Sequence, residues 1–181
     1  MRVATPTAKT KNVCKDFASR DFVLREAELR DADEIHDILK QAFKGLEGRG
    51  YSARAIEAAV ISAEEIRKRI LLGEQVIVAE LGNEIIGTVT GVEEHESMHV
   101  CSLAVHPKYQ NRGVAKQLMK HLEKIAHDKK CHKLFLCTAW SMTEAIRLYE
   151  TLGYEEEGHL RRYFCGEDFI VFSRFIKRRE N

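Results

Sequence analysis

The chain has 181 residues, of which 44% are hydrophobic and 31% are charged, and its formal net charge is +1. These values are typical of a globular protein with one buried core, and the small charge gives no reason to expect binding to nucleic acid or to a membrane. No apolar run approaches the roughly 20 residues of a membrane span, and the first residues lack a signal-peptide core. We therefore expect a cytoplasmic protein with a flexible arm at 1–20 and a single domain at 21–181.

Cysteine and histidine spacing gives no sign of a metal centre. The five cysteines are odd in number, no pair has C-x-x-C spacing, and the eight histidines are scattered. Neither a disulfide framework nor a zinc site is predicted, and the expected metal content is none.

The first half of the chain reads as a strand followed by helices. Phe22–Leu24 indicates a strand, and apolar residues at helical spacing run from Asp31 to Phe43. A second helical region extends from Ala55 to Leu71 and is closed by Gly73. Three pairs with capping-box spacing accompany the predicted helices, namely Asp31 with Glu34, Ser62 with Glu65, and Ser141 with Glu144.

The second half alternates between strands and helices. Val76–Ala79 and Ile85–Thr90 flank the turn signal Gly82-Asn83 and predict a β-hairpin. Further strands are expected at His99–Val105, Leu134–Cys137, from Tyr154 onward and at Phe169–Phe172, with helices at Val114–Asp128 and around Ile146–Leu152. The order predicts a mixed α/β fold in which helices cover a sheet.

The segment from Leu103 to Lys116 carries the strongest chemical signal. A strand runs into the short loop Gln110-Asn111-Arg112-Gly113-Val114-Ala115, which runs directly into a helix. The first turn of a helix has unpaired N–H groups and the positive end of the helix dipole, so phosphate binds there. Gly113 would allow close approach of the ligand, and Arg112 would add a positive charge. Neither the P-loop pattern nor the dinucleotide pattern G-x-G-x-x-G occurs in the chain.

The pattern Gln-x-x-Gly-x-Ala resembles the pyrophosphate loop of the GNAT superfamily of acyl-CoA-dependent N-acyltransferases. Leu103-Ala104-Val105-His106-Pro107 is similar to the strand that leads into that loop, and Glu144–Tyr154 is similar to the family's second signature helix. The resemblance covers about 22–176. It implies an acyl-CoA N-acyltransferase fold of about seven strands flanked by about four helices, and an enzyme that transfers an acetyl group from acetyl-CoA to a primary amine by direct attack.

The resemblance also implies which residues hold the donor. The pantetheine arm would lie between the splayed fourth and fifth strands, and a backbone N–H near Leu103 would stabilise the oxyanion. Thr143 stands where the family often has an asparagine that contacts CoA. The full set of implied contacts is Leu103, Ala104, Val105, Gln110, Asn111, Arg112, Gly113, Val114, Ala115, Lys116 and Thr143.

For catalysis, Tyr149 matches the tyrosine that serves many members as general acid toward the CoA thiolate; periodicity alone would let it simply pack on its helix. The base is open, because Thr138 stands at about the position where related enzymes carry a glutamate. Candidates are the residues near the start of the fourth strand, with Glu94 and His99 placed first among Glu93, Glu94, His95, Glu96 and His99.

The acceptor site is implied to form from Phe43–Tyr51 and Leu160–Phe169, with Gly45–Gly50 as a lid. Arg161–Phe164 favours a peptide N-terminus, while a lysine or a small-molecule amine stays open. A homodimer is also left open by the resemblance. A second hypothesis, prompted by Thr138, is a non-catalytic acyl-CoA sensor of the same fold; a nucleotide-binding or nucleic-acid-binding protein is disfavoured by the missing motifs and the small net charge.

Overall fold

The computed structural model describes residues 22–46 and 52–176. The expected arm at 1–20, the loop residues 47–51 and the end of the chain from 177 lie outside the described residues, so the predicted lid and arm are not placed. None of the described helices is long and apolar enough to cross a membrane.

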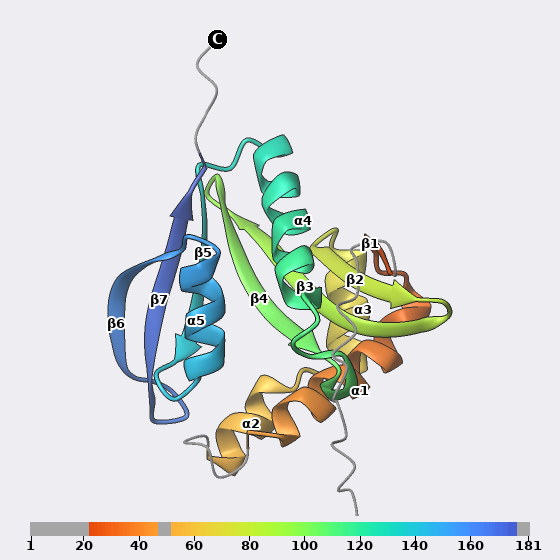
Figure 1. Cartoon of the computed structure of the whole chain (residues 1–181), viewed down its shortest axis with the longest axis horizontal. Helices are drawn as coiled ribbons and strands as arrows, with labels where there is room; N and C mark the ends of the chain where they lie inside the picture. Colours follow the sequence, from red (N-terminus) through yellow and green to blue (C-terminus); the bar gives the residue numbers. More distant parts are fainter. Residues whose placement is uncertain (1–21, 47–51, 177–181) are drawn as a thin grey trace, which may run out of the picture.

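The described residues form one seven-stranded sheet with helices on both faces (Figure 1). Two short 3-10 turns, Leu29–Asp31 and Pro107–Tyr109, precede α1 and α4. The strands and helices follow one another as β1 (Val23–Glu26), α1 (Ala32–Lys44), α2 (Ala53–Ala59), α3 (Ala63–Leu71), β2 (Gln75–Leu81), β3 (Glu84–Glu94), β4 (Ser97–Val105), α4 (Val114–Asp128), β5 (Lys133–Ala139), α5 (Thr143–Thr151), β6 (Glu155–Phe164) and β7 (Glu167–Phe175).

The sheet has the order β1-β2-β3-β4-β5-β7-β6. Every neighbouring pair is antiparallel except β4 and β5, which are parallel and pair only from Ser97↔Lys133 to His99↔Phe135. Beyond His99 the two strands diverge, and Figure 1 shows the gap widening toward the end of β4. The predicted splay between the fourth and fifth strands is therefore present.

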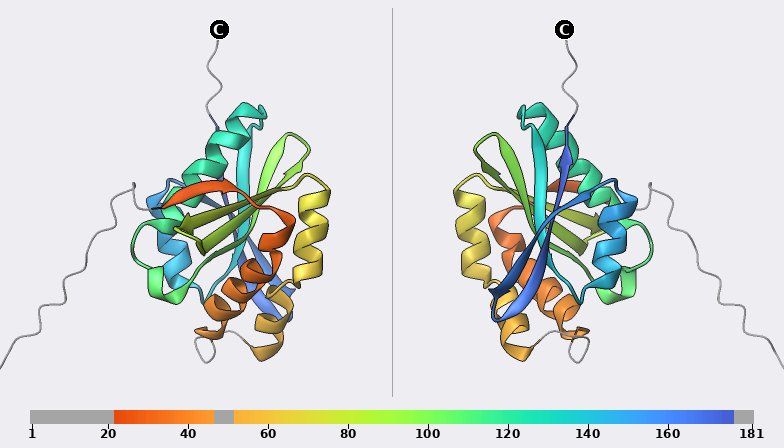
Figure 2. Two further views of the ribbon diagram at one scale, coloured as in Figure 1. Left: turned by 90° about the vertical axis from the view of Figure 1, so that its right-hand side faces the viewer. Right: turned by 90° about the vertical axis from the view of Figure 1, so that its left-hand side faces the viewer.

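Helices cover the two halves of the sheet unequally. On one face, α4 lies against β2 to β5 and α5 lies beside it (Figures 1 and 2). On the other face, α1 contacts β3 and β4, and α3 contacts β2. Several residues of β5 and β7 on that second face are only half-buried or exposed, although Ser173 between them is buried. We call this surface the bare face: Lys133, Phe135, Cys137, Val171 and Phe175.

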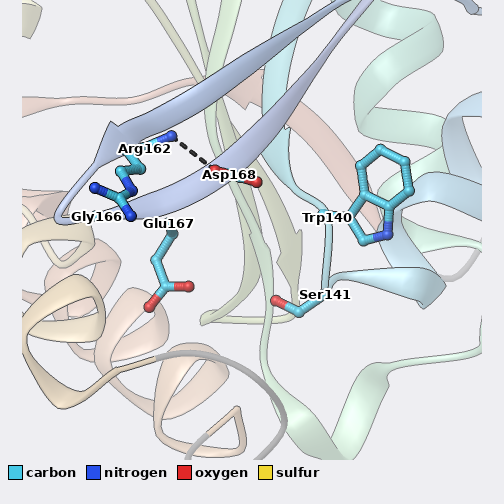
Figure 3. Close-up of a pocket in the computed structure, with 6 residues that line it drawn as sticks. All are labelled: Trp140, Ser141, Arg162, Gly166, Glu167 and Asp168. Carbon is cyan, nitrogen blue, oxygen red and sulfur yellow. Dashed lines mark hydrogen bonds between the residues drawn. The ribbon is translucent and has the colours of Figure 1, made fainter.

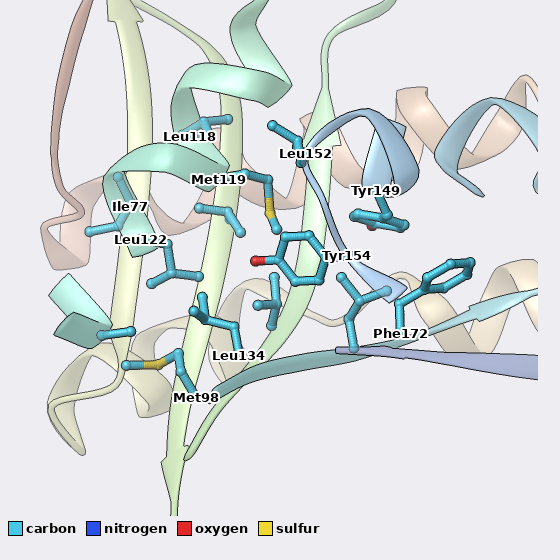
Figure 4. Packing of buried hydrophobic residues seen from close by; sticks show 14 of the residues in the cluster. Ile77, Met98, Leu118, Met119, Leu122, Leu134, Tyr149, Leu152, Tyr154 and Phe172 are labelled. Carbon is cyan, nitrogen blue, oxygen red and sulfur yellow. The ribbon is translucent and has the colours of Figure 1, made fainter. Parts of the chain in front are cut away.

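The main core lies between α4, α5 and the sheet (Figure 4). Leu118 and Leu122 of α4 are fully buried there. A Cβ atom at Gly91 of β3 would stand 2.6 Å from Leu122 Cδ1 and 2.7 Å from Met98 Sδ, so glycine is required for α4 to approach the sheet this closely.

The sequence predictions for the elements are confirmed in type and order. The hairpin at Gly82-Asn83 joins β2 to β3, and the helix predicted at Val114–Asp128 is present with those bounds. β3 and β4 extend further than the apolar residues indicated, because only two residues, His95 and Glu96, turn the chain between them.

Two of the three capping boxes are wrong. Ser62 Oγ does accept the N–H of Glu65 at 3.2 Å. Asp31 Oδ2 instead accepts the N–H of Glu28 at 2.7 Å, and Glu34 accepts the N–H of Ile85.

The third capping box, at Ser141, fails because α5 begins only after Met142. The Ser141 hydroxyl is buried and has no hydrogen-bond partner among the described residues.

Candidate active site

The loop between β4 and α4 is built to expose backbone N–H groups. Gln110 Nε2 donates to the carbonyl of Val105 at 3.1 Å and ties the loop to the end of β4. Gly113 has φ +81° and serves as the N-cap of α4, and no side chain caps this helix. The first-turn N–H groups of α4 therefore face a ligand position without competition from a capping side chain.

Charges around this helix start suit an anion. The first turn of α4 contains no acidic residue, whereas Lys116 lies in it and Arg112 precedes it. Cations at a helix N-terminus are opposed by the helix dipole unless an anion binds between them. The Arg112 guanidinium lies over the ring of Tyr109 at 5.6 Å, and the Tyr109 hydroxyl donates to Glu84 at 2.8 Å, which orients this side of the loop.

A bulge distorts β4 just before the loop. Thr88 pairs with Ala104, but Thr90 pairs with Cys101, so two β4 residues stand opposite one of β3. Ser102 sits in this bulge with φ +54°. Such bulges re-aim backbone groups, and here the affected groups are those of Ser102 and Leu103.

The edge of β4 that faces β5 is open to a ligand. Pairing ends at His99, so the backbone from Val100 to Val105 makes no ladder with β5. Leu103, Ala104 and Val105 lie on this stretch, directly before the loop. The structure thus brings the predicted strand and loop contacts into one continuous path.

Tyr149 lies on α5, on the other side of the splay from α4. It is 8% exposed and packs against Tyr154 and Phe172, with ring centroids 6.0 and 6.1 Å away (Figure 4). Thr143 is exposed at the start of α5, where its hydroxyl contacts Glu144 at 3.3 Å. Both residues are carried by the strand-to-helix unit that forms the far wall of the gap.

Glu94 and His99 form a pair at the closed end of the splay. His99 Nδ1 lies 3.5 Å from Glu94 Oε1, and the imidazole stacks on Phe135 at 4.7 Å. Leu103 follows His99 by four residues, which is about 13 Å along a strand. A base at this place would reach an amine beside Leu103 through water.

A cleft opens where the β6–β7 hairpin meets the end of β5 (Figure 3). The hairpin contributes Arg162, Glu167 and Asp168, and the segment after β5 contributes Trp140 and Ser141. Glu167 accepts the N–H of Ser52 at 3.2 Å, so the hairpin tip is fastened to the start of α2. This is the region where the sequence placed the acceptor.

Sequence reasoning missed two features of this site. Ser102 gave no signal, because serine is not a residue that favours positive φ; the bulge follows from pairing with β3. Trp140 is 54% exposed at the cleft, and its backbone N–H donates to the carbonyl of Asp168 at 3.0 Å. The available signal was a tryptophan three residues after the predicted strand Leu134–Cys137.

A mixed sheet that splays between two parallel strands, next to an uncapped helix start, defines the class of acyl-CoA-dependent N-acyltransferases. The family model for the acetyltransferase (GNAT) family matches residues 32–154. The chain therefore belongs to the GNAT acetyltransferase family, and the expected fold and transferase class are confirmed.

Individual relatives agree with this assignment. The chain is 37% identical over 93 residues to the N-terminal acetyltransferase B complex catalytic subunit NAA20 of Arabidopsis thaliana, an alignment that covers 48% of this chain and about half, 53%, of that protein. Among solved structures, the ribosomal-protein-S18-alanine N-acetyltransferase of Escherichia coli superposes with a TM-score of 0.73 at 20% identity, covering 88% of this chain and 97% of that one. PaiA N-acetyltransferase of Thermoplasma acidophilum in complex with coenzyme A superposes with a TM-score of 0.75 at 16% identity, covering 86% of this chain and 99% of that one.

Proposed function

We propose that the protein transfers an acetyl group from acetyl-CoA to the primary amine of a polypeptide. One observation carries the proposal: the β4–β5 splay opens beside the uncapped start of α4, so a thioester and a diphosphate can be held along one path. The N–H groups of Gln110–Ala115 would hold the pyrophosphate, with Arg112 and Lys116 as charge partners. The free edge of Leu103, Ala104 and Val105 would pair with the pantetheine arm, and Thr143 would contact CoA from the other wall.

The bulge would supply the oxyanion donor. With Ser102 in the left-handed region, the N–H of Leu103 is no longer part of a regular ladder with β3. A backbone donor aimed at the thioester carbonyl stabilises the negative charge that develops as the amine attacks, by a few kcal/mol in typical cases. Holding both reactants in one gap supplies much of the remaining acceleration.

Tyr149 would give its proton to the departing CoA thiolate. Its burial between the core and the gap holds the ring in place, so the hydroxyl needs no reorganisation. General acids of this kind contribute about 10²-fold or more to the rate.

Glu94 and His99 would remove the proton of the incoming ammonium through water. Alkyl amines are mostly protonated at neutral pH, so some base must act before attack.

The acceptor would enter at the cleft between the β6–β7 hairpin and the end of β5. Glu167 and Asp168 place carboxylates there, which suits an amine that arrives as an ammonium ion. The name of the Arabidopsis relative is that of an N-terminal acetyltransferase, and the Escherichia coli protein is named for acetylating an alanine of a ribosomal protein; both support a polypeptide acceptor.

The proposal is tested by thermal-shift titration followed by a turnover assay. A ligand that binds only the native state raises the melting temperature once its concentration exceeds its dissociation constant. We expect acetyl-CoA and CoA to raise it and ATP and NAD to leave it unchanged, and we expect release of free CoA thiol when peptides with free N-termini are added. The absence of a shift with both CoA species would refute the proposal.

A second candidate is a non-catalytic acyl-CoA sensor. The observation that favours it is Thr138, a buried residue without an ionisable group where related enzymes carry a glutamate. A thermal shift with acetyl-CoA but no thiol release across a broad panel of peptides, lysine and small amines would favour the sensor.

A further inference from the structure

The bare face carries a groove outside the donor path and the hairpin cleft. It is lined by Glu94, Lys133, Phe135, Glu157, Leu160 and Val171 among others, and so draws on five strands. Its floor is apolar, because Phe135, Leu160 and Val171 present half-buried side chains there. On this side of the sheet the helices α1 and α3 contact β2, β3 and β4.

This groove and the hairpin cleft lie on neighbouring stretches of the same two strands. Leu160 and Val171 line the groove, and Arg162 and Asp168 line the cleft, two and three residues further along β6 and β7. At about 3.3 Å per residue, these positions are about 7 to 10 Å apart. His159 of the groove also packs edge-on against Trp140 of the cleft, with ring centroids 4.8 Å apart.

Carboxylates gather at the groove. Glu94 and Glu157 line it, and Glu155 pairs with Ser173, which lies two positions from Val171 on β7 and so on the same face of the sheet. Lys133 pairs with Glu157 at 3.1 Å, and His99 Nδ1 lies 3.5 Å from Glu94 Oε1. Since the whole chain has a net charge of +1, this acidity is local to the groove.

We propose that the groove binds the acceptor polypeptide beyond its reactive end, and that this following segment is basic. The inference rests on the proposed function, since it assumes that the amine lies in the hairpin cleft. Phe135 and Lys133 of β5 lie five and seven residues before Trp140 in the chain. An extended peptide segment of about that length therefore reaches from the cleft to the groove. Its basic side chains meet Glu94, Glu155 and Glu157, and its backbone lies over Phe135, Leu160 and Val171.

The experiment measures binding of labelled peptides to the protein in the presence of CoA, which prevents turnover. The probes share their first residues: a peptide of about ten residues with arginines from about the fourth to the eighth position, its glutamine counterpart, and a dipeptide amide. Arginine is used because lysine side chains are themselves acceptors. We expect the arginine peptide to bind about tenfold tighter than the glutamine peptide, and the difference to shrink as ionic strength rises.

A double variant locates the effect on the bare face. Glu155→Gln with Glu157→Gln removes two exposed carboxylates and releases Lys133, so affinity for the arginine peptide should fall about fivefold or more, with the dipeptide amide unaffected. Glu64→Gln on α3 is the matched control, since it removes an exposed carboxylate away from the groove.

Equal affinity for the arginine and glutamine peptides, or an unchanged affinity in the double variant, would overturn the inference. Acetyl transfer that ignores peptide length and charge would refute the groove while leaving the transferase proposal intact. Charge-dependent binding without transfer to any amine would refute the transferase proposal instead.

Discussion

The two halves of the sheet, on either side of the splay, perform their tasks by different means. Strands β2 to β4 are packed by α4 on one face and by α1 and α3 on the other, and the donor path that we propose along β4 consists almost entirely of backbone groups. Strands β5, β7 and β6 carry α5 on one face and leave the other bare, and their candidate sites are made of side chains. The well-packed half, β1 to β4, therefore suits a single donor. The half with the bare face, β5 to β7, can accept different side chains and so suit different acceptors.

The largest expected difference between the halves is in packing energy. Leu122→Ala removes a fully buried side chain of α4 and should lower the free energy of unfolding by about 2 to 5 kcal/mol. Val171→Ala removes a half-buried side chain from the bare face and should cost less than about 1.5 kcal/mol. Chemical denaturation of both variants measures the contrast, and equal costs would show that the bare face is packed as tightly as the core.

The next effect is catalytic and uses two neighbouring tyrosines. Tyr149→Phe should lower kcat about 100-fold with acetyl-CoA binding unchanged, because only the proton donor is lost. Tyr154→Phe is the matched control: its hydroxyl is buried beside Glu123, and burial raises the pKa of that phenol far above its usual value. Similar kcat values for the two variants would remove Tyr149 from the catalytic role.

A third effect tests an ion pair in the well-packed half. Burial tends to raise the pKa of Asp31, but hydrogen bonds from Arg25 and from the N–H of Glu28 outweigh it and lower the pKa below its usual value. Because the folded state favours the carboxylate, Asp31→Asn should cost about 2 kcal/mol at neutral pH. The difference should shrink as the pH falls through about 3.8 and below, as followed by thermal melts. A difference that stays constant across this range would exclude ionisation as its source.

The smallest effect concerns the backbone of the donor loop. A Cβ at Gly113 would meet nothing within 4 Å, so Gly113→Val adds strain at φ +81° without a clash. A valine there lets the free loop relax out of the left-handed conformation, and returning to it on binding costs about 1 to 2 kcal/mol, which predicts roughly tenfold weaker acetyl-CoA binding by thermal shift. Gly45→Ala, at φ −69°, is the control that should bind normally.

The half of the sheet formed by β1 to β4, with the loop before α4, could be predicted from the sequence, because a site made of backbone groups requires particular residues. Gly113 marks a left-handed position, and the apolar spacing of Val114, Leu118 and Leu122 predicted α4 with its bounds. The bulge at Ser102 was not readable, since it results from the register between β3 and β4. The helix start at Asp31 was readable, but its capping box with Glu34 was not, because Glu34 instead accepts the N–H of Ile85, a residue of β3.

The candidate sites on β5, β7 and β6 could not be predicted from local sequence patterns. The sequence alone determined the order of strands and helices, the phosphate-type loop and its family, because each depends on short-range periodicity and on residues adjacent in the chain. Tertiary structure alone decided that Trp140 and the hairpin share a cleft, that Glu94 meets His99, and that glutamates of two distant segments flank one groove. These contacts join segments separated in sequence, and they exist only once strand pairing has set the register across the splay.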